Sequence, residues 1–217
     1  MAPRTPYADR VHPALILGFA LAIAPLALTP GASFTLTFSY APRGPRAVGS
    51  VIAGTGLGTF THAALAAVGL AAIVMRSAQI YRAIQLAGAI YLIILGITMF
   101  RSINHKRTKT PRRFDLARGR GPLLTAYIAN VLNPKAAGVY LTLAPQFIPA
   151  HAMSLTAMET LAATHVVVMA AWLSCVGFTL SAVAQRIKIE RILRGIQRAG
   201  ALVLIALGIR TSTEVLA

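Results

Sequence analysis

The chain has 217 residues, of which 56% are hydrophobic and 12% are charged, and its mean hydropathy is +0.68. Soluble domains carry about 25% charged residues, so the composition excludes a soluble globular domain and indicates an integral membrane protein. The formal net charge is +16, but the basic residues lie mostly between and beside apolar stretches, with no aromatic interleaving or nucleic-acid-binding motif. We therefore expect no nucleic-acid partner, and we expect membrane lipids around the chain.

The apolar stretches predict an all-α membrane protein with six transmembrane helices in a single transporter domain, residues 1–217. Each stretch is long enough to cross about 30 Å at 1.5 Å per residue. They span about 14–40, 48–75, 84–100, 122–149, 160–184 and a last stretch that ends near 209. Basic residues precede the first stretch as in a signal peptide, but no small-x-small cleavage site follows it, so we expect it to be the first span.

The first and fourth spans are interrupted by similar triplets, Thr29-Pro30-Gly31 and Asn133-Pro134-Lys135. Thr and Asn are good helix N-caps, and proline suits the first helical position because it has no N–H to leave unpaired. The sequence therefore predicts that each helix stops and restarts at the midplane of the membrane.

Lys135 stands about a dozen residues from either end of its span. A charge at the bilayer centre costs about 2.5–3.5 kcal/mol on insertion scales, so such a residue usually faces a water-filled cavity or a ligand. Two restarted helices would add partial positive charge and free amides, which suit a carboxylate. We therefore take both triplets, Thr29, Pro30, Gly31, Asn133, Pro134 and Lys135, as candidate substrate-binding residues. A proline kink with Lys135 reaching an interface is the alternative.

Two histidines lie within spans, and histidine titrates near neutral pH. His62 and His165 are therefore candidates for proton coupling, although an intramembrane histidine is more often a hydrogen-bonded packing residue. All five Asp and Glu residues fall at span ends or in loops, and two histidines alone are a weak metal signal. We expect no metal site, no cofactor and no catalytic residue.

An internal repeat relates the two halves of the chain. Residues 82–97 and 194–209 are identical at 11 of 16 positions, and at a similar offset His62 pairs with His165 and Thr29 with Asn133. The repeats cover about 14–100 and 122–210. Because three spans per repeat is an odd number, the second copy enters from the opposite face, which gives the inverted repeat of many alternating-access transporters.

Six glycines within spans are candidates for close helix packing, since small residues let neighbouring helix backbones approach. Two of them form a small-xxx-small face in the second span, and four lie in the repeated segments of the third and sixth spans: Gly54 and Gly58, then Gly88, Gly96, Gly200 and Gly208.

The basic loop 101–120 holds eight Lys or Arg and one acid, whereas the link 150–157 holds no Lys or Arg. The positive-inside rule therefore places that loop in the cytoplasm and both termini outside. Arg76 and Arg82 are the one contrary signal.

Several motifs resemble the lysine-exporter (LysE/RhtB) family of amino-acid efflux proteins across nearly the whole chain. They are Thr29-Pro30-Gly31, the glycine-rich start of the second span, Gly88-Ala89-x-Tyr91-Leu92-x-x-Leu95-Gly96, Leu132-Asn133-Pro134-Lys135-Ala136 and Ala144-Pro145-Gln146-Phe147. The resemblance implies an exporter of amino acids or related small carboxylates in the bacterial inner membrane. The chain departs from the family at Ala32-Ser33, where Pro-Asn is usual, and near Thr59, where some members have an acid.

A secondary-active exporter with a small-molecule amino-acid substrate is thus the expected function. The lack of an intramembrane acid favours neutral or small amino acids and disfavours the alternative of a metal-cation exporter. An intramembrane enzyme would need a Ser–His pair or metal cluster at helical spacing, and a passive membrane scaffold would not place a lysine at the midplane. The sequence leaves the substrate, the coupling ion and the oligomeric state open, a homodimer included.

Overall fold

A computed structural model describes residues 12–29, 31–102, 121–148, 152–182 and 189–216. Every regular element in these ranges is helical, which confirms the predicted all-α class. The elements are α1 (Pro13–Leu28), α2 (Ala32–Tyr40), η1 (Ala41–Arg43), α3 (Pro45–Arg76), α4 (Ala78–Ser102), α5 (Pro122–Val131), α6 (Pro134–Gly138), η3 (Val139–Leu143), η4 (Ala144–Phe147), α7 (Leu155–Ala182) and α8 (Ile189–Leu216). The predicted basic loop falls mainly on residues 103–120, which lie outside the described ranges.

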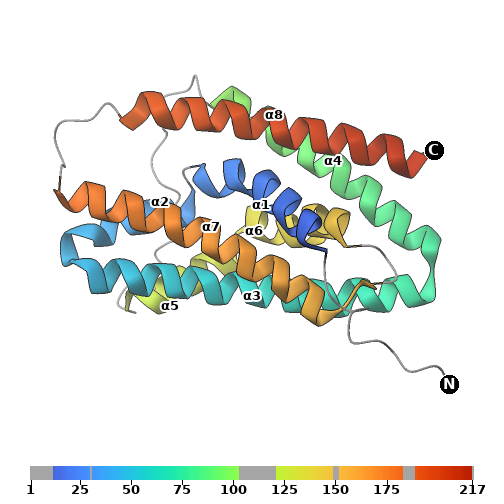
Figure 1. Cartoon of the computed structure of the whole chain (residues 1–217), viewed down its shortest axis with the longest axis horizontal. Helices are drawn as coiled ribbons and strands as arrows, with labels where there is room; N and C mark the ends of the chain where they lie inside the picture. Colours follow the sequence, from blue (N-terminus) through green and yellow to red (C-terminus); the bar gives the residue numbers. More distant parts are fainter. Residues whose placement is uncertain (1–11, 30, 103–120, 149–151, 183–188, 217) are drawn as a thin grey trace.

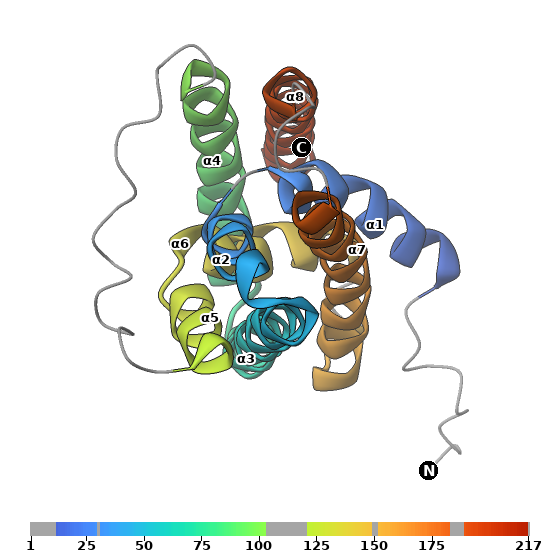
Figure 2. The same cartoon turned by 90° about the vertical axis from the view of Figure 1, so that its left-hand side faces the viewer.

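Long helices surround two interrupted passes of the chain. Helices α3, α4, α7 and α8 run along the length of the molecule; α3 and α4 run in opposite directions, and so do α7 and α8 (Figure 1). Helices α1, α2 and α6 lie between the pair α4 and α8 on one side and the pair α3 and α7 on the other (Figure 2). Thr29 at the first break is buried, whereas Leu132 and Pro134 at the second break are exposed.

Two helical segments are each long and apolar enough to cross a membrane, Pro45–Leu70 and Leu155–Gly177. The bent pair Pro13–Leu28 and Ala32–Arg43, with 58° between its helices, makes a third if it counts as one span. Within the described residues this is fewer than the six spans predicted. The reason is local: the break leaves α5 with 10 residues, and the apolar part of α4 is confined to Arg82–Thr98.

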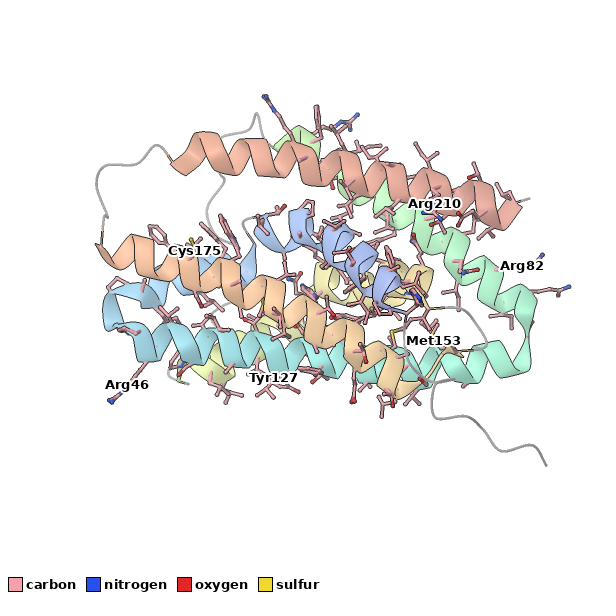
Figure 3. All side chains as sticks on the ribbon, in the orientation of Figure 1. Arg46, Arg82, Tyr127, Met153, Cys175 and Arg210 are labelled. Carbon is pink, nitrogen blue, oxygen red and sulfur yellow. The ribbon has the colours of Figure 1, made fainter. Side chains whose placement is uncertain are left out.

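Large apolar side chains cover the outside of the bundle as well as its inside. Leu21, Leu65, Val68 and Val167 are each more than 60% exposed, while Phe19, Ile23, Tyr140 and Leu161 are completely buried. Arg46 and Arg82 lie at opposite ends of the molecule (Figure 3). An apolar outer surface with charges at the ends is the pattern expected when lipid surrounds the helices.

Close helix contacts occur at most of the glycines singled out in the sequence. A Cβ atom at Gly54 would overlap the carbonyl oxygen of Leu123 on α5, and one at Gly58 would lie 2.7 Å from Oδ1 of Asn130. A Cβ at Gly88 would lie 2.7 Å from Cβ of Thr142 in η3. Helix α5 thus rests directly on the glycine face of α3.

The contact between α4 and α8 is reciprocal. A Cβ at Gly96 of α4 would meet Ala201 and Ile205 of α8, and a Cβ at Gly208 of α8 would meet Ala89 and Ile93 of α4. These residues correspond in the sequence repeat, because Ala89 aligns with Ala201 and Ile93 with Ile205. Gly200, the remaining glycine of the set, also lies in α8.

We expect Gly54→Ala to destabilise the protein, because the added methyl would collide with the backbone of Leu123 rather than with a movable side chain. Overpacking of this kind costs about 1–3 kcal/mol of the free energy of unfolding. Gly49→Ala on the same helix is the matched control, since nothing lies within 4 Å of a Cβ there. Thermal unfolding in detergent measures both, and equal melting temperatures for the two variants would contradict the close packing.

Candidate functional site

The first interrupted pass breaks at residues 29–31. Helix α1 ends at Leu28, and the hydroxyl of Thr29 donates a hydrogen bond to the Pro25 carbonyl at 2.7 Å. Gly31, in an extended conformation, stands at the N-cap of α2 and makes no side-chain capping bond. The sequence predicted Thr29 as this cap, which is wrong, because its hydroxyl turns back to α1. The cap position of α2 therefore holds a residue with no side chain. Pro30 lies outside the described residues.

The second interrupted pass breaks at residues 132–133. Helix α5 ends at Val131, and Oδ1 of Asn133 accepts a hydrogen bond from the Lys135 amide at 3.0 Å. Asn133 is therefore a true N-cap, as its residue type predicts. The Lys135 amide is consequently occupied, whereas the sequence argument counted it as free to bind a ligand.

Tyr91 of α4 supports the restart at α6. Its hydroxyl donates to the Pro134 carbonyl at 3.0 Å, and its ring covers Gly138, where a Cβ would lie within 2.5 Å of the ring edge. A side chain at 138 would push this tyrosine away. The start of α6, and with it the backbone of Lys135, is thus held from α4.

Lys135 reaches from the second break to the first. Its Nζ donates to the Leu26 carbonyl at 2.8 Å, in the last turn of α1. A helical carbonyl normally accepts from the amide four residues later, and for Leu26 that residue is Pro30, which has no N–H. The ammonium thus pairs with a carbonyl left open at the negative end of a helix. The lysine expected to be unpaired has a protein partner.

The other break has the same arrangement with a different side chain. Asn130 stands three residues before Asn133, as Leu26 does before Thr29, and Pro134 cannot donate to its carbonyl. The Asn130 carbonyl lies 3.1 Å from Nε2 of His62 on α3. The Asn130 carbonyl also accepts from the Asn133 amide at 2.9 Å, so unlike the Leu26 carbonyl it is not left open. In both breaks the carbonyl four residues before the proline is contacted by a nitrogen-bearing side chain from the other half of the chain.

The two histidines lie on either side of one buried tyrosine. Nδ1 of His165 is 3.0 Å from the Tyr140 hydroxyl, and the Tyr140 ring centroid is 6.5 Å from that of His62 and 6.0 Å from that of His165. Both histidines are 9% exposed. Both are therefore hydrogen-bonded within the bundle, and Tyr140, which sequence reasoning did not single out, connects them.

A cavity of about 70 Å³ lies where the two breaks meet. About 10–15 Å³ suffices for one water molecule, so this cavity has room for a small polar ligand group or several waters. The predicted site residues among its lining are Thr29, Gly31, Asn133, Lys135 and His165. His62 and Pro134 are not among the lining residues.

The rest of the lining is partly polar and partly apolar. Ser33, Thr55, Thr59 and Asn130 add neutral polar groups, and no Asp or Glu is found among the lining residues that the structure describes. Among the described lining residues, Lys135 and His165 are the ionisable side chains. Among the described residues, no three His, Cys, Asp or Glu residues gather as metal ligands would. The arrangement favours a ligand with an anionic group.

Comparison with known proteins identifies the family to which the chain is similar. A model of the LysE type translocator family matches residues 24–214. The chain is 24% identical over 208 residues to the uncharacterized membrane protein YrhP of Bacillus subtilis, covering 90% of this chain and 97% of the relative. It is 33% identical over 149 residues to the homoserine/homoserine lactone efflux protein of Salmonella typhi, covering 66% of this chain and 69% of that protein. No solved structure matches.

Proposed function

This chain belongs to the LysE type translocator family of multi-pass membrane proteins, and on that footing we propose that it exports a small neutral amino acid or related carboxylate across the bacterial inner membrane. The observation that carries the proposal is the cavity between the two helix breaks, with Lys135 in its wall. The related protein of Salmonella typhi is named for homoserine and homoserine lactone efflux, which makes homoserine the first substrate to test.

The substrate carboxylate would bind where positive charge already gathers. Lys135 uses one of its three N–H donors on Leu26, and the start of α2 has no side-chain cap at Gly31. A carboxylate can accept from the ammonium and from the first amides of α2 together. The described lining residues include no Asp or Glu, which argues against a substrate with a cationic side chain and against the alternative of a metal-cation exporter.

Transport by alternating access is supported by the two-fold character of the contacts. The α4–α8 contact is reciprocal at Gly96 and Gly208, and the carbonyls of Leu26 and Asn130 are each contacted by a side chain from the opposite half. We propose that residues about 14–100 and 122–210 are inverted repeats that rock about the cavity, which lies near the membrane midplane.

Lys135→Gln tests the site. Glutamine still offers an N–H to the Leu26 carbonyl but has no charge, so folding should persist while the substrate loses a charge-assisted hydrogen bond. We expect homoserine export from proteoliposomes to fall roughly 10- to 100-fold. Arg210→Gln is the control, because Arg210 is exposed and paired with Glu214 in α8.

Lys135→Met removes the donor as well as the charge, so it should also destabilise the first break. If folded Lys135→Gln protein exports homoserine, or another neutral amino acid that the parent exports, at the parental rate, then the cavity is not the substrate site.

The proposed topology puts both termini outside and the end of α4 in the cytoplasm. The α2–α3 junction and the start of α8 lie at one end of the molecule, and the α3–α4 junction and the end of α8 lie at the other, as this topology requires (Figure 1). Single cysteines at Ser102 and Ser154 test it in a Cys175→Ala background, because Cys175 is exposed. An impermeant reagent added to intact cells should label the cysteine at 154 and spare the one at 102; the reverse pattern would invert the orientation.

We also propose that His62 and His165 couple export to proton entry. With both present, export should rise as the external pH falls, because a steeper inward proton gradient drives an exporter that is coupled to proton entry more strongly. The double variant His62→Gln with His165→Gln should lose this pH dependence. Tyr140→Phe removes the hydrogen bond to His165 but leaves both imidazoles, so it should keep the dependence. A parental pH profile in the double variant would make the histidines packing residues.

A further inference from the structure

The two ring nitrogens of His165 on α7 have different surroundings. Nδ1 is 3.0 Å from the Tyr140 hydroxyl in the interior of the bundle. Nε2 makes no hydrogen bond with a described residue, yet it is not among the fully buried side-chain atoms that lack a partner. His165 is 9% exposed and lines the cavity between the helix breaks, so Nε2 is the ring nitrogen that is open to the cavity.

Tyr140 is held in a fixed orientation. It lies in η3, a single π-helical turn, and such turns are rare and often occur at functional sites. Its side chain is completely buried. Its ring is stacked between those of His62 and His165, with interplanar angles of 7° and 24°. The direction of its hydroxyl is therefore set by the packing around the ring.

The Tyr140 hydroxyl determines which nitrogen of His165 carries the proton. A buried O–H group needs an acceptor, and Nδ1 of His165 is the partner that the described residues offer it. When the hydroxyl donates to Nδ1, that nitrogen holds no proton of its own, and a neutral imidazole then carries its proton on Nε2. His165 therefore presents an N–H donor to the cavity.

The corresponding histidine of the first repeat has a different role. Nε2 of His62 lies 3.1 Å from the Asn130 carbonyl, and because a carbonyl can only accept, the N–H of His62 is used within the protein. His62 is also not among the described lining residues. One histidine thus holds the end of α5, and the other faces the cavity.

We propose that His165, with its tautomer set by Tyr140, donates its Nε2–H to the substrate's carboxylate. This inference rests on the proposed export function and deepens it. An ionised carboxylate has about four lone-pair sites, so it can accept from His165 as well as from Lys135 and the start of α2. Lys135 and His165 line the same cavity of about 70 Å³, so one small ligand can reach both. Tyr140 acts through His165 and is a positioning residue.

Variants of the full-length protein in proteoliposomes test the binding role through the KM of homoserine export. His165→Leu removes the donor, so KM should rise roughly 10- to 100-fold while kcat changes far less. His165→Gln keeps a side-chain N–H close to the position of Nε2, so its KM should stay near the parental value.

Tyr140→Phe removes the group that fixes the tautomer, so KM should rise, but less than in His165→Leu. Tyr127→Phe is the matched control, because the Tyr127 hydroxyl lies 3.4 Å from that of Thr61 and Tyr127 does not line the cavity. Its KM should be parental.

Nuclear magnetic resonance of protein labelled with ¹⁵N-histidine tests the tautomer independently of transport. At about pH 8 an ordinary histidine is neutral, and the nitrogen shifts show which ring nitrogen carries the proton. The His165 signals, identified by their loss in His165→Gln, should show the proton on Nε2 in the parent and a mixture of tautomers in Tyr140→Phe. Homoserine should shift the Nε2 signal, and a proton found on Nδ1 in the parent would overturn the inference.

The outcomes distinguish the inference from the function beneath it. If the parent exports homoserine or another neutral amino acid while folded His165→Leu keeps the parental KM, or if His165→Gln raises KM as much as His165→Leu, the donor role is wrong and export stands. If His165→Leu does not fold, an Nε2 signal that saturating substrate leaves unchanged decides against the inference. If the parent exports no neutral amino acid, the proposed function falls and the inference with it.

Discussion

The hydrogen bond from Lys135 Nζ to the Leu26 carbonyl joins the two interrupted passes of the chain. It exists because Pro30 cannot donate to that carbonyl and because Asn133 caps the helix that begins with Pro134 and Lys135. Without the first break, Lys135 would lose the Leu26 carbonyl as its acceptor. Without the second break, Lys135 would no longer stand at the start of a helix. The cavity lies between the two breaks, so its shape and the stability of the breaks depend on the same residues.

The breaks and the central lysine could be predicted from the sequence because their causes are local. Proline, N-cap residues and a charge within an apolar run act on the residues beside them. The partners could not be predicted in the same way. Lys135 and Leu26 are 109 positions apart, and nothing in an apolar run identifies one carbonyl as an acceptor until the tertiary structure is known. In hindsight a rule was available, since each proline frees the carbonyl four residues before it.

The same limit explains the other differences between expectation and structure. Thr29 looked like an N-cap by residue type, but its hydroxyl had a competing acceptor in Pro25, one turn earlier. Tyr140 and Asn130 were overlooked because a tyrosine or an asparagine in an apolar run carries no signal of its neighbours. The sequence identified Gly54 and Gly58 as small residues suited to close packing. Only the structure shows that Gly54 lies against the Leu123 carbonyl and Gly58 against the Asn130 side-chain amide.

The described part of the cavity lining holds no acidic residue, and this has an electrical consequence for the proposed transport. While Lys135 is protonated, binding of a zwitterion adds no net charge, so the cavity holds one positive charge both empty and loaded. An anionic substrate would instead neutralise it. The transmembrane voltage acts on an elementary charge with about 2.3 kcal/mol per 100 mV. If the substrate is a zwitterion, the membrane voltage therefore acts equally on the loaded and the empty protein. The direction of net transport is then set by the substrate concentrations on the two sides and by any ion that moves with the substrate.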